Sequence, residues 1–142
     1  MDGKPIRVLF ICTGNSCRSQ LAEALLRARG DNRYDVHSAG VIPSGVHPLV
    51  LQVLSEIGVH AAGQTSKHWN ECLEAPPFDF VITLCDFAAQ SCPVFPGEGR
   101  RLHWPFFDPV GARGTREERL ALFRHCRDAV AERIRQFIEE TT

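Results

Sequence analysis

Residues 11–20 read ICTGNSCRSQ, and this stretch joins an apolar run to a helical pattern. The run before it, Ile6–Cys12, is continuously apolar, as expected for a strand buried on both faces of a parallel sheet. The residues after it, Arg18–Arg29, repeat apolar side chains at helical spacing and stop at Gly30. We therefore predict a strand, a tight loop and a helix, in that order.

The loop between this strand and helix has the composition of an anion-binding site. Backbone N–H groups of a short loop leading into a helix can converge on one point, where the helix N-terminus adds partial positive charge. Gly14 permits close backbone approach, and Asn15 tolerates left-handed torsions. Arg18 can hold two oxygens of a tetrahedral oxyanion in a fork. The predicted oxyanion-binding residues are Thr13, Gly14, Asn15, Ser16, Cys17 and Arg18.

Cys12 is the predicted nucleophile beneath this loop. The positive field of the loop favours a thiolate, so we expect Cys12 to be ionised near neutral pH, with Ser19 donating a hydrogen bond to it. Cys17 is interpreted as a packing residue rather than a second nucleophile. The alternative is a buried strand-end cysteine beside a surface arginine, because Cys-x5-Arg alone also occurs by chance.

Alternating strand and helix patterns continue along the chain. They predict strands at 34–39, 78–85 and 102–106, and a helix at 47–58. Thr115 and Glu118 form a capping box before a long helix with an apolar stripe. This order predicts an open parallel sheet with helices on both sides, which binds ligands beyond the carboxyl ends of its strands. Cys12 and Cys85 both lie at such ends.

Length and charge favour one domain spanning residues 1–142 and a locally recognised ligand. Sixteen basic and seventeen acidic residues leave a net charge of -1, which gives no field for nucleic acid or a membrane surface. The N-terminus reads as a strand rather than a signal peptide, and no run approaches the length of a membrane span. Six cysteines in such a chain favour a reducing cytoplasm over a disulfide framework, which is typical of small secreted domains.

The segment ICTGNSCRSQ resembles the signature loop of the low-molecular-weight tyrosine phosphatase fold, and within that fold the thioredoxin-coupled arsenate reductases. The resemblance implies a single-domain α/β fold, an open four-stranded parallel sheet flanked by helices. Asp108-Pro109 stands where this family carries its general acid. We expect Trp104, Phe106 and Phe107 to desolvate that carboxyl and favour its protonated form. Without the resemblance, an ordinary Asp-Pro turn is the favoured interpretation.

Cys85 and Cys92 have the spacing at which the resembled reductases carry their second and third redox cysteines. Seven residues span about 10 Å in a helix and about 23 Å in a strand, whereas a disulfide needs Cα atoms about 4.4–6.8 Å apart. We therefore predict that residues 86–92 are redox-switched rather than a fixed helix, and that helix is lost on oxidation. Two buried cysteines or two zinc ligands are the alternatives, but structural zinc prefers closer cysteine pairs. No metal site is predicted, and Cys72 and Cys126 are interpreted as structural.

The resemblance implies an arsenical-resistance enzyme with a three-cysteine relay. Cys12 attacks arsenate held by Arg18 and the loop amides, and Asp108 protonates the departing oxygen. Cys85 then attacks Cys12 and releases arsenite, and Cys92 attacks Cys85. Thioredoxin reduces the final disulfide, phosphate and sulfate compete with arsenate, and no bound cofactor takes part. We expect a monomer.

Two other functions stay open. A phosphatase that hydrolyses phosphomonoesters through a Cys12 adduct would not need Cys85 or Cys92. Many phosphatases of this fold have tyrosines after the Asp-Pro pair, and here the only tyrosine is Tyr34. A non-catalytic thiol module that binds arsenite or senses oxidants would need neither Arg18 nor Asp108.

A potassium site is a further point of comparison with the resembled family. Some members bind potassium through residues matching Asn15, Glu23, Ser38 and an aspartate after a Thr-Ser pair. Here Lys67 follows Thr65-Ser66, and its ammonium can substitute for the ion or exclude it. We therefore expect activity that does not depend on potassium.

Overall fold

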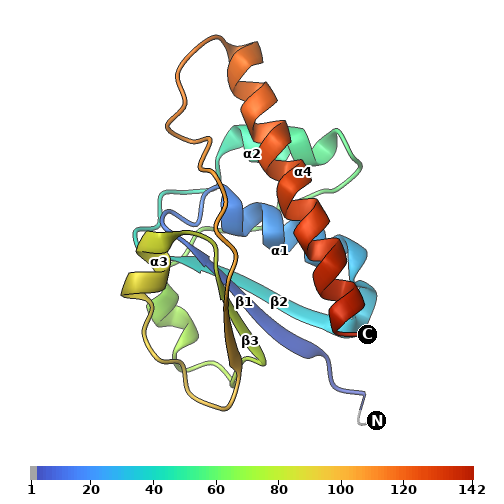
Figure 1. The fold of residues 1–142 in the computed structure, drawn as a ribbon, viewed down its shortest axis with the longest axis vertical. Coiled ribbons are helices and arrows are strands. Elements are labelled where there is room, and N and C mark those ends of the chain that lie inside the picture. Colours follow the sequence, from blue (N-terminus) through green and yellow to red (C-terminus); the bar gives the residue numbers. More distant parts are fainter. Residues whose placement is uncertain (1–2) are drawn as a thin grey trace.

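A computed structural model describes residues 3–142, in which four parallel strands form one sheet in the order β2-β1-β3-β4. The strands are β1 (Ile6–Cys12), β2 (Tyr34–Gly40), β3 (Phe80–Thr83) and β4 (Arg100–His103). The helices are α1 (Arg18–Arg29), α2 (Pro48–Ser55), α3 (Asp86–Ser91) and α4 (Arg116–Glu140), with short 3₁₀ helices η1 (Asp31–Arg33) and η2 (Trp69–Cys72) (Figure 1). The predicted four-stranded parallel α/β fold is confirmed. Residues 1–2 of the domain predicted over 1–142 lie outside the described residues.

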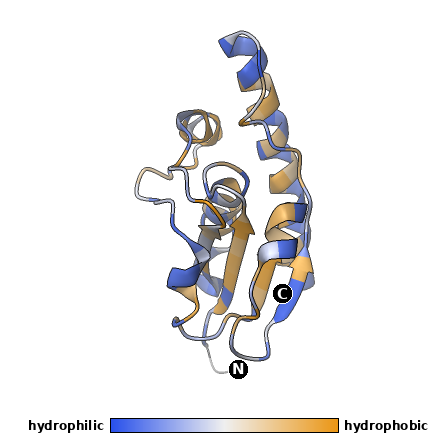
Figure 2. Ribbon diagram, turned by 90° about the vertical axis from the view of Figure 1, so that its left-hand side faces the viewer, coloured by the Kyte–Doolittle hydropathy of each residue, from blue (hydrophilic) through white to orange (hydrophobic). Residues whose placement is uncertain are grey.

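The helices cover opposite faces of the sheet. On one face, Phe137 of α4 packs edge-on against Phe80 of β3, with ring centroids 5.0 Å apart. α1 contacts α4 along the same side. α3 contacts β1 and β3, and it meets the side chains of β4 that point to the other face. The central strands are mostly hydrophobic in Figure 2, because they are covered from both sides.

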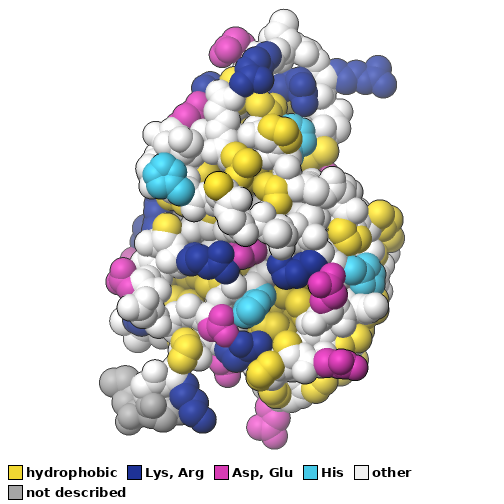
Figure 3. Space-filling model, turned by 180° about the vertical axis from the view of Figure 1, so that it is seen from behind, with side chains coloured by type: hydrophobic (Ala, Val, Ile, Leu, Met, Phe, Trp, Pro, Cys, Tyr) yellow, Lys and Arg dark blue, Asp and Glu magenta, His cyan; other side chains and the backbone are white. Residues whose placement is uncertain are grey.

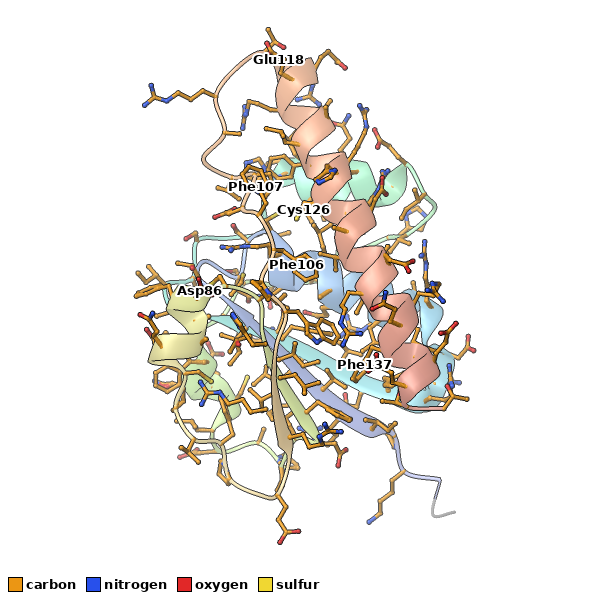
Figure 4. The ribbon with its side chains drawn as sticks, viewed as in Figure 1. Asp86, Phe106, Phe107, Glu118, Cys126 and Phe137 are labelled. Atoms are coloured by element: carbon orange, nitrogen blue, oxygen red, sulfur yellow. The ribbon has the colours of Figure 1, made fainter. Side chains whose placement is uncertain are left out.

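The last helix begins as the sequence predicts. The Thr115 hydroxyl accepts the Glu118 N–H, and the Glu118 side chain accepts the Thr115 N–H, which completes the capping box. Figure 4 follows α4 from Glu118 past Cys126 to Phe137. Within residues 3–142, no helix is long and apolar enough to cross a membrane. Basic and acidic side chains intermingle on the face drawn in Figure 3, in line with the balanced charge.

Three predicted boundaries are wrong, each for a local reason. β4 begins at Arg100 and ends at His103, rather than spanning 102–106, because its neighbour β3 ends at Thr83, which pairs with His103. β3 is limited to Phe80–Thr83, the four residues that pair with β4, instead of 78–85. α2 ends at Ser55, three residues before Gly58, whose φ of +76° lies in the left-handed region.

Candidate active site

The loop after β1 encloses a small cavity at the carboxyl edge of the sheet. The cavity has a volume of about 170 Å³ and is lined by Cys12, Thr13, Gly14, Ser16, Cys17, Arg18, Ser44, Asp108 and Val110. Cys12 is the last residue of β1, and Arg18 is the first of α1. Five of the six predicted oxyanion-binding residues therefore line one cavity with the predicted nucleophile and general acid. The sixth, Asn15, does not.

Asn15 is fully buried beneath the loop, with a φ of +46°. Its Oδ1 accepts the backbone N–H of Lys67 at 2.8 Å, and this donor fixes which end of the amide is oxygen. Its Nδ2 therefore donates to the hydroxyls of Ser19 at 2.8 Å and Ser38 at 2.9 Å. Gly40 packs against this turn, and a Cβ at position 40 would lie only 2.8 Å from the backbone nitrogen of Asn15. Asn15 shapes the loop rather than facing the cavity.

The same network sets the direction of the hydrogen bond at Cys12. The Ser19 hydroxyl lies 2.9 Å from the Cys12 Sγ and accepts from Asn15, so its own proton is free to point at the sulfur. Both Cys12 and Ser19 are buried. The expected Ser19–Cys12 contact is therefore present, with Ser19 as donor.

Arg18 holds its guanidinium at the cavity wall. Its side chain is 8% exposed, and its Nη2 lies 3.2 Å from Oδ2 of Asp108. Its Nη1 donates to the Phe106 carbonyl at 3.4 Å. Its Nε is buried and has no partner among the described residues. A buried guanidinium with a free donor, at the start of a helix and beside the loop that leads into it, suits a tetrahedral oxyanion.

Asp108 is less enclosed than its aromatic neighbours suggest. Its side chain is 45% exposed, and its Oδ1 accepts the Val110 N–H at 3.0 Å. Trp104 is buried in the core against Phe10, whereas Phe107 is 59% exposed. The expected aromatic shield is therefore wrong, because nearly half of the carboxyl side chain is open to solvent. Figure 4 shows Phe106 and Phe107 on the segment between β4 and α4, beside α4.

Cys85 reaches the loop from the end of β3. Its Sγ lies 3.2 Å from the Thr13 Oγ1, next to Cys12 in the chain, and it is buried. Cys85 also caps α3, accepting the Ala88 N–H at 3.3 Å. Cys92 follows the other end of α3 and is partly exposed. All six cysteines are free, so the segment predicted to switch is a short helix in the thiol state.

The remaining cysteines lie in packed surroundings. Cys17 is buried, and a hydrogen bond with Cys126, together with burial, raises the pKa of its thiol. This supports its interpretation as a packing residue. Cys126 lies on the buried stripe of α4 and donates to the Phe107 carbonyl at 3.6 Å. Burial also raises the pKa of Cys72.

Sequence reasoning missed Ser44 and Val110, which complete the cavity wall. Ser44 is placed by its N–H, which donates to the Gly14 carbonyl at 2.9 Å. Neither residue belongs to a motif with a chemical signature. Their positions follow from how the loops after β2 and β4 fold over the first loop.

An open parallel sheet with a cysteine at the base of an oxyanion-shaped loop defines a thiol enzyme acting on tetrahedral oxyanions or their esters. The chain belongs to the low molecular weight phosphotyrosine protein phosphatase family, whose pattern matches residues 7–142. It is 43% identical over 132 residues to the arsenate reductase of Halalkalibacterium halodurans, covering 93% of this chain and 94% of that protein.

Two solved structures illustrate the likeness. An arsenate reductase in a phosphate-binding state has a TM-score of 0.77 and 33% identity, covering 96% of this chain and 99% of its own. A thioredoxin-dependent arsenate reductase of Corynebacterium glutamicum has a TM-score of 0.75 and 30% identity, covering 100% of this chain and 66% of its own. Arsenate reductases are thus similar to this chain both in sequence and in structure.

Proposed function

We propose that this chain reduces arsenate to arsenite through a relay of Cys12, Cys85 and Cys92, with thioredoxin as the final reductant. The observation that carries this proposal is the contact of Cys85 with the oxyanion loop, where its Sγ lies 3.2 Å from the Thr13 hydroxyl. A second thiol at the nucleophile's loop has no task in phosphate ester hydrolysis. It is required where two electrons must be supplied.

The loop and Arg18 bind the oxyanion in this proposal. The unpartnered Nε of Arg18 and the backbone N–H groups of the loop residues that line the cavity supply the donors. Phosphate and sulfate have the same tetrahedral shape and compete for the loop. Asp108, already in contact with Arg18, protonates the departing oxygen.

The relay balances atoms and electrons without a bound cofactor. The Cys12 thiolate displaces one oxygen of arsenate, which leaves as water after protonation. Cys85 attacks the Cys12 sulfur, and the electron pair of the S–As bond passes to arsenic, which leaves as arsenite. Cys92 attacks the Cys85 sulfur, and Cys12 departs as a thiolate. A Cys85–Cys92 disulfide remains for the reductant.

Thioredoxin is the proposed reductant because a disulfide at Cys92 is near the surface. Cys92 is partly exposed, and the following Val94 is 90% exposed, whereas Cys12 is buried. An external dithiol therefore reaches Cys92 more readily than Cys12. A reducing cytoplasm and a monomeric chain belong to the same proposal.

The test is arsenate-dependent NADPH oxidation with thioredoxin and thioredoxin reductase. We expect sustained turnover by the parent and a single turnover by Cys92→Ser. Cys72→Ala removes a buried thiol away from the site and should match the parent. Repeated turnover by Cys92→Ser would overturn the relay. Turnover with glutaredoxin but not thioredoxin would replace the reductant, and phosphomonoester hydrolysis without arsenate reduction would replace the function.

A further inference from the structure

Arg101 and His103 of β4 contact both ends of α3, the helix that separates the two relay cysteines. The strand register aligns Arg101 with Val81 and His103 with Thr83. Residues two apart in a strand lie on the same face, so both side chains point to the face covered by α3. Arg100, the first residue of β4, comes directly before Arg101 in the strand and therefore points to the opposite face.

Arg101 holds the last turn of α3. Its Nη2 donates to the Ala89 carbonyl at 2.7 Å and lies 3.5 Å from the Cys92 carbonyl. The final carbonyls of a helix lack partners within the helix, and a cation is favourable there. Arg101 therefore closes the end of α3 that carries Cys92.

His103 holds the first turn of α3. Its Nε2 lies 3.0 Å from the Oδ1 of Asp86, the first residue of the helix. Its Nδ1 lies 2.8 Å from the Thr83 hydroxyl, which fixes the ring on the sheet. Figure 4 places Asp86 at the start of α3, above the strands. The helix is thus attached to one strand at both ends.

The contacts of Arg101 and His103 with α3 are present in a structure in which Cys85 and Cys92 are both thiols. Cys85 and Cys92 flank the six residues of α3, and a helical separation of about 10 Å is too long for a disulfide. Bringing the two Cα atoms together moves the ends of α3 relative to each other. Because β4 is paired with β3, its side chains cannot move with both ends of α3. At least one of the contacts of Arg101 and His103 with α3 therefore breaks.

We infer that Arg101 and His103 are positioning residues that stabilise the thiol form of the Cys85–Cys92 pair and thereby raise its reduction potential. The inference rests on the proposed relay. Oxidation of the two thiols forms one S–S bond and passes two electrons and two protons to a disulfide oxidant. Because the attachments stabilise only the reduced side, removing them favours the disulfide and makes the potential more negative. The attachments thus keep the final disulfide easy for an external dithiol to reduce.

The experiment measures the equilibrium of this pair in dithiothreitol redox buffers, in a Cys12→Ser background so that Cys85 cannot pair with Cys12. Alkylation and mass spectrometry of the peptide containing both cysteines report the oxidised fraction. Arg101→Met removes the charge and donors but keeps an apolar stem, which suits a residue that lines a small surface pocket together with Phe78 and Val94. Arg100→Met is the matched control, since it removes the same charge from the opposite face of the same strand.

We expect Arg101→Met to shift the equilibrium about three- to tenfold toward the disulfide, about 15 to 30 mV for two electrons. His103→Ala should shift it the same way, Arg101→Lys should recover part of the loss, and Arg100→Met should leave it unchanged. Amides of α3 in the reduced Arg101→Met protein should also exchange faster.

Two results would overturn the inference and separate it from the relay. Equal potentials for Arg101→Met and Arg100→Met would reject the role of Arg101 while leaving the relay intact. If no Cys85–Cys92 disulfide forms in any variant, the relay and the inference fail together.

Discussion

The Nη2 of Arg18 lies 3.2 Å from the Oδ2 of Asp108, which joins the predicted oxyanion-binding group to the predicted general acid. The two residues are ninety positions apart, on the first loop and on the segment before α4. Arg18 is nearly buried and Asp108 is half exposed, so the carboxyl stands at the mouth of the cavity. An oxyanion bound by Arg18 would therefore meet the carboxyl at its exposed side.

Asp108→Asn should slow the first reduction step by about 10²- to 10⁴-fold, the usual contribution of a positioned general acid. The amide keeps the shape of the side chain but cannot deliver the proton. Rapid-quench measurement of arsenite release in a single turnover checks this, with phosphate binding as the test that the loop is intact. Asp31→Asn, on the surface, is the control. A first step as fast as that of the parent would remove Asp108 from the mechanism.

Ser19→Ala should slow the attack of Cys12 about ten- to a hundredfold at neutral pH, because a hydrogen bond to a charged group contributes about 1.5–3 kcal/mol. The Asn15 amide directs the Ser19 proton toward the sulfur, which is 2.9 Å away. The rate of Cys12 alkylation by iodoacetamide against pH provides the measurement. Ser55→Ala, at the end of α2, is a control of the same chemistry. Identical profiles for the two variants would contradict the assignment.

Activity should be insensitive to replacing sodium by potassium at constant ionic strength. Buried Glu23 already has a cation, since the Nη2 of Arg27 lies 2.7 Å from its Oε2, and it accepts a hydrogen bond from Ser38. Asn15 and Ser38 are likewise satisfied by their neighbours. Steady-state turnover in the two salts is the measurement. A several-fold activation by potassium would contradict the prediction.

The conversion of the Cys12–Cys85 disulfide to Cys85–Cys92 should accelerate with rising pH. Burial raises the pKa of the Cys92 thiol, and the charge of Arg101 offsets this only in part. Only the thiolate attacks, and below the thiol pKa its fraction grows about tenfold per pH unit. A raised pKa therefore keeps the rate climbing to higher pH than for an exposed cysteine. Quenched-flow alkylation from about pH 7 to 9 follows the step, and a flat profile would contradict the prediction.

The fold was predictable wherever short-range pattern sets the structure. The apolar run of β1, the stop of α1 at Gly30 and the capping box at Thr115 are all local signals, and all three are confirmed. The strand β4 was misplaced because its residues are exposed or half-buried and give no clear apolar pattern. Its range follows from pairing with β3, not from hydropathy.

The same distinction between local sequence signals and long-range contacts applies to the site. The sequence by itself determined the loop of residues 12–19, because strand, loop and helix follow one another directly between Ile6 and Arg29. The order of Cys12, Cys85 and Cys92 in a relay stays a prediction that the resemblance implies. Only the tertiary structure decided that Asn15 is buried, that Asp108 contacts Arg18 and stays half exposed, and that side chains of β4 bind α3. These relationships depend on strand register and on long loops, where a shift of one residue exchanges the two faces of a strand. No local pattern in the chain encodes that register.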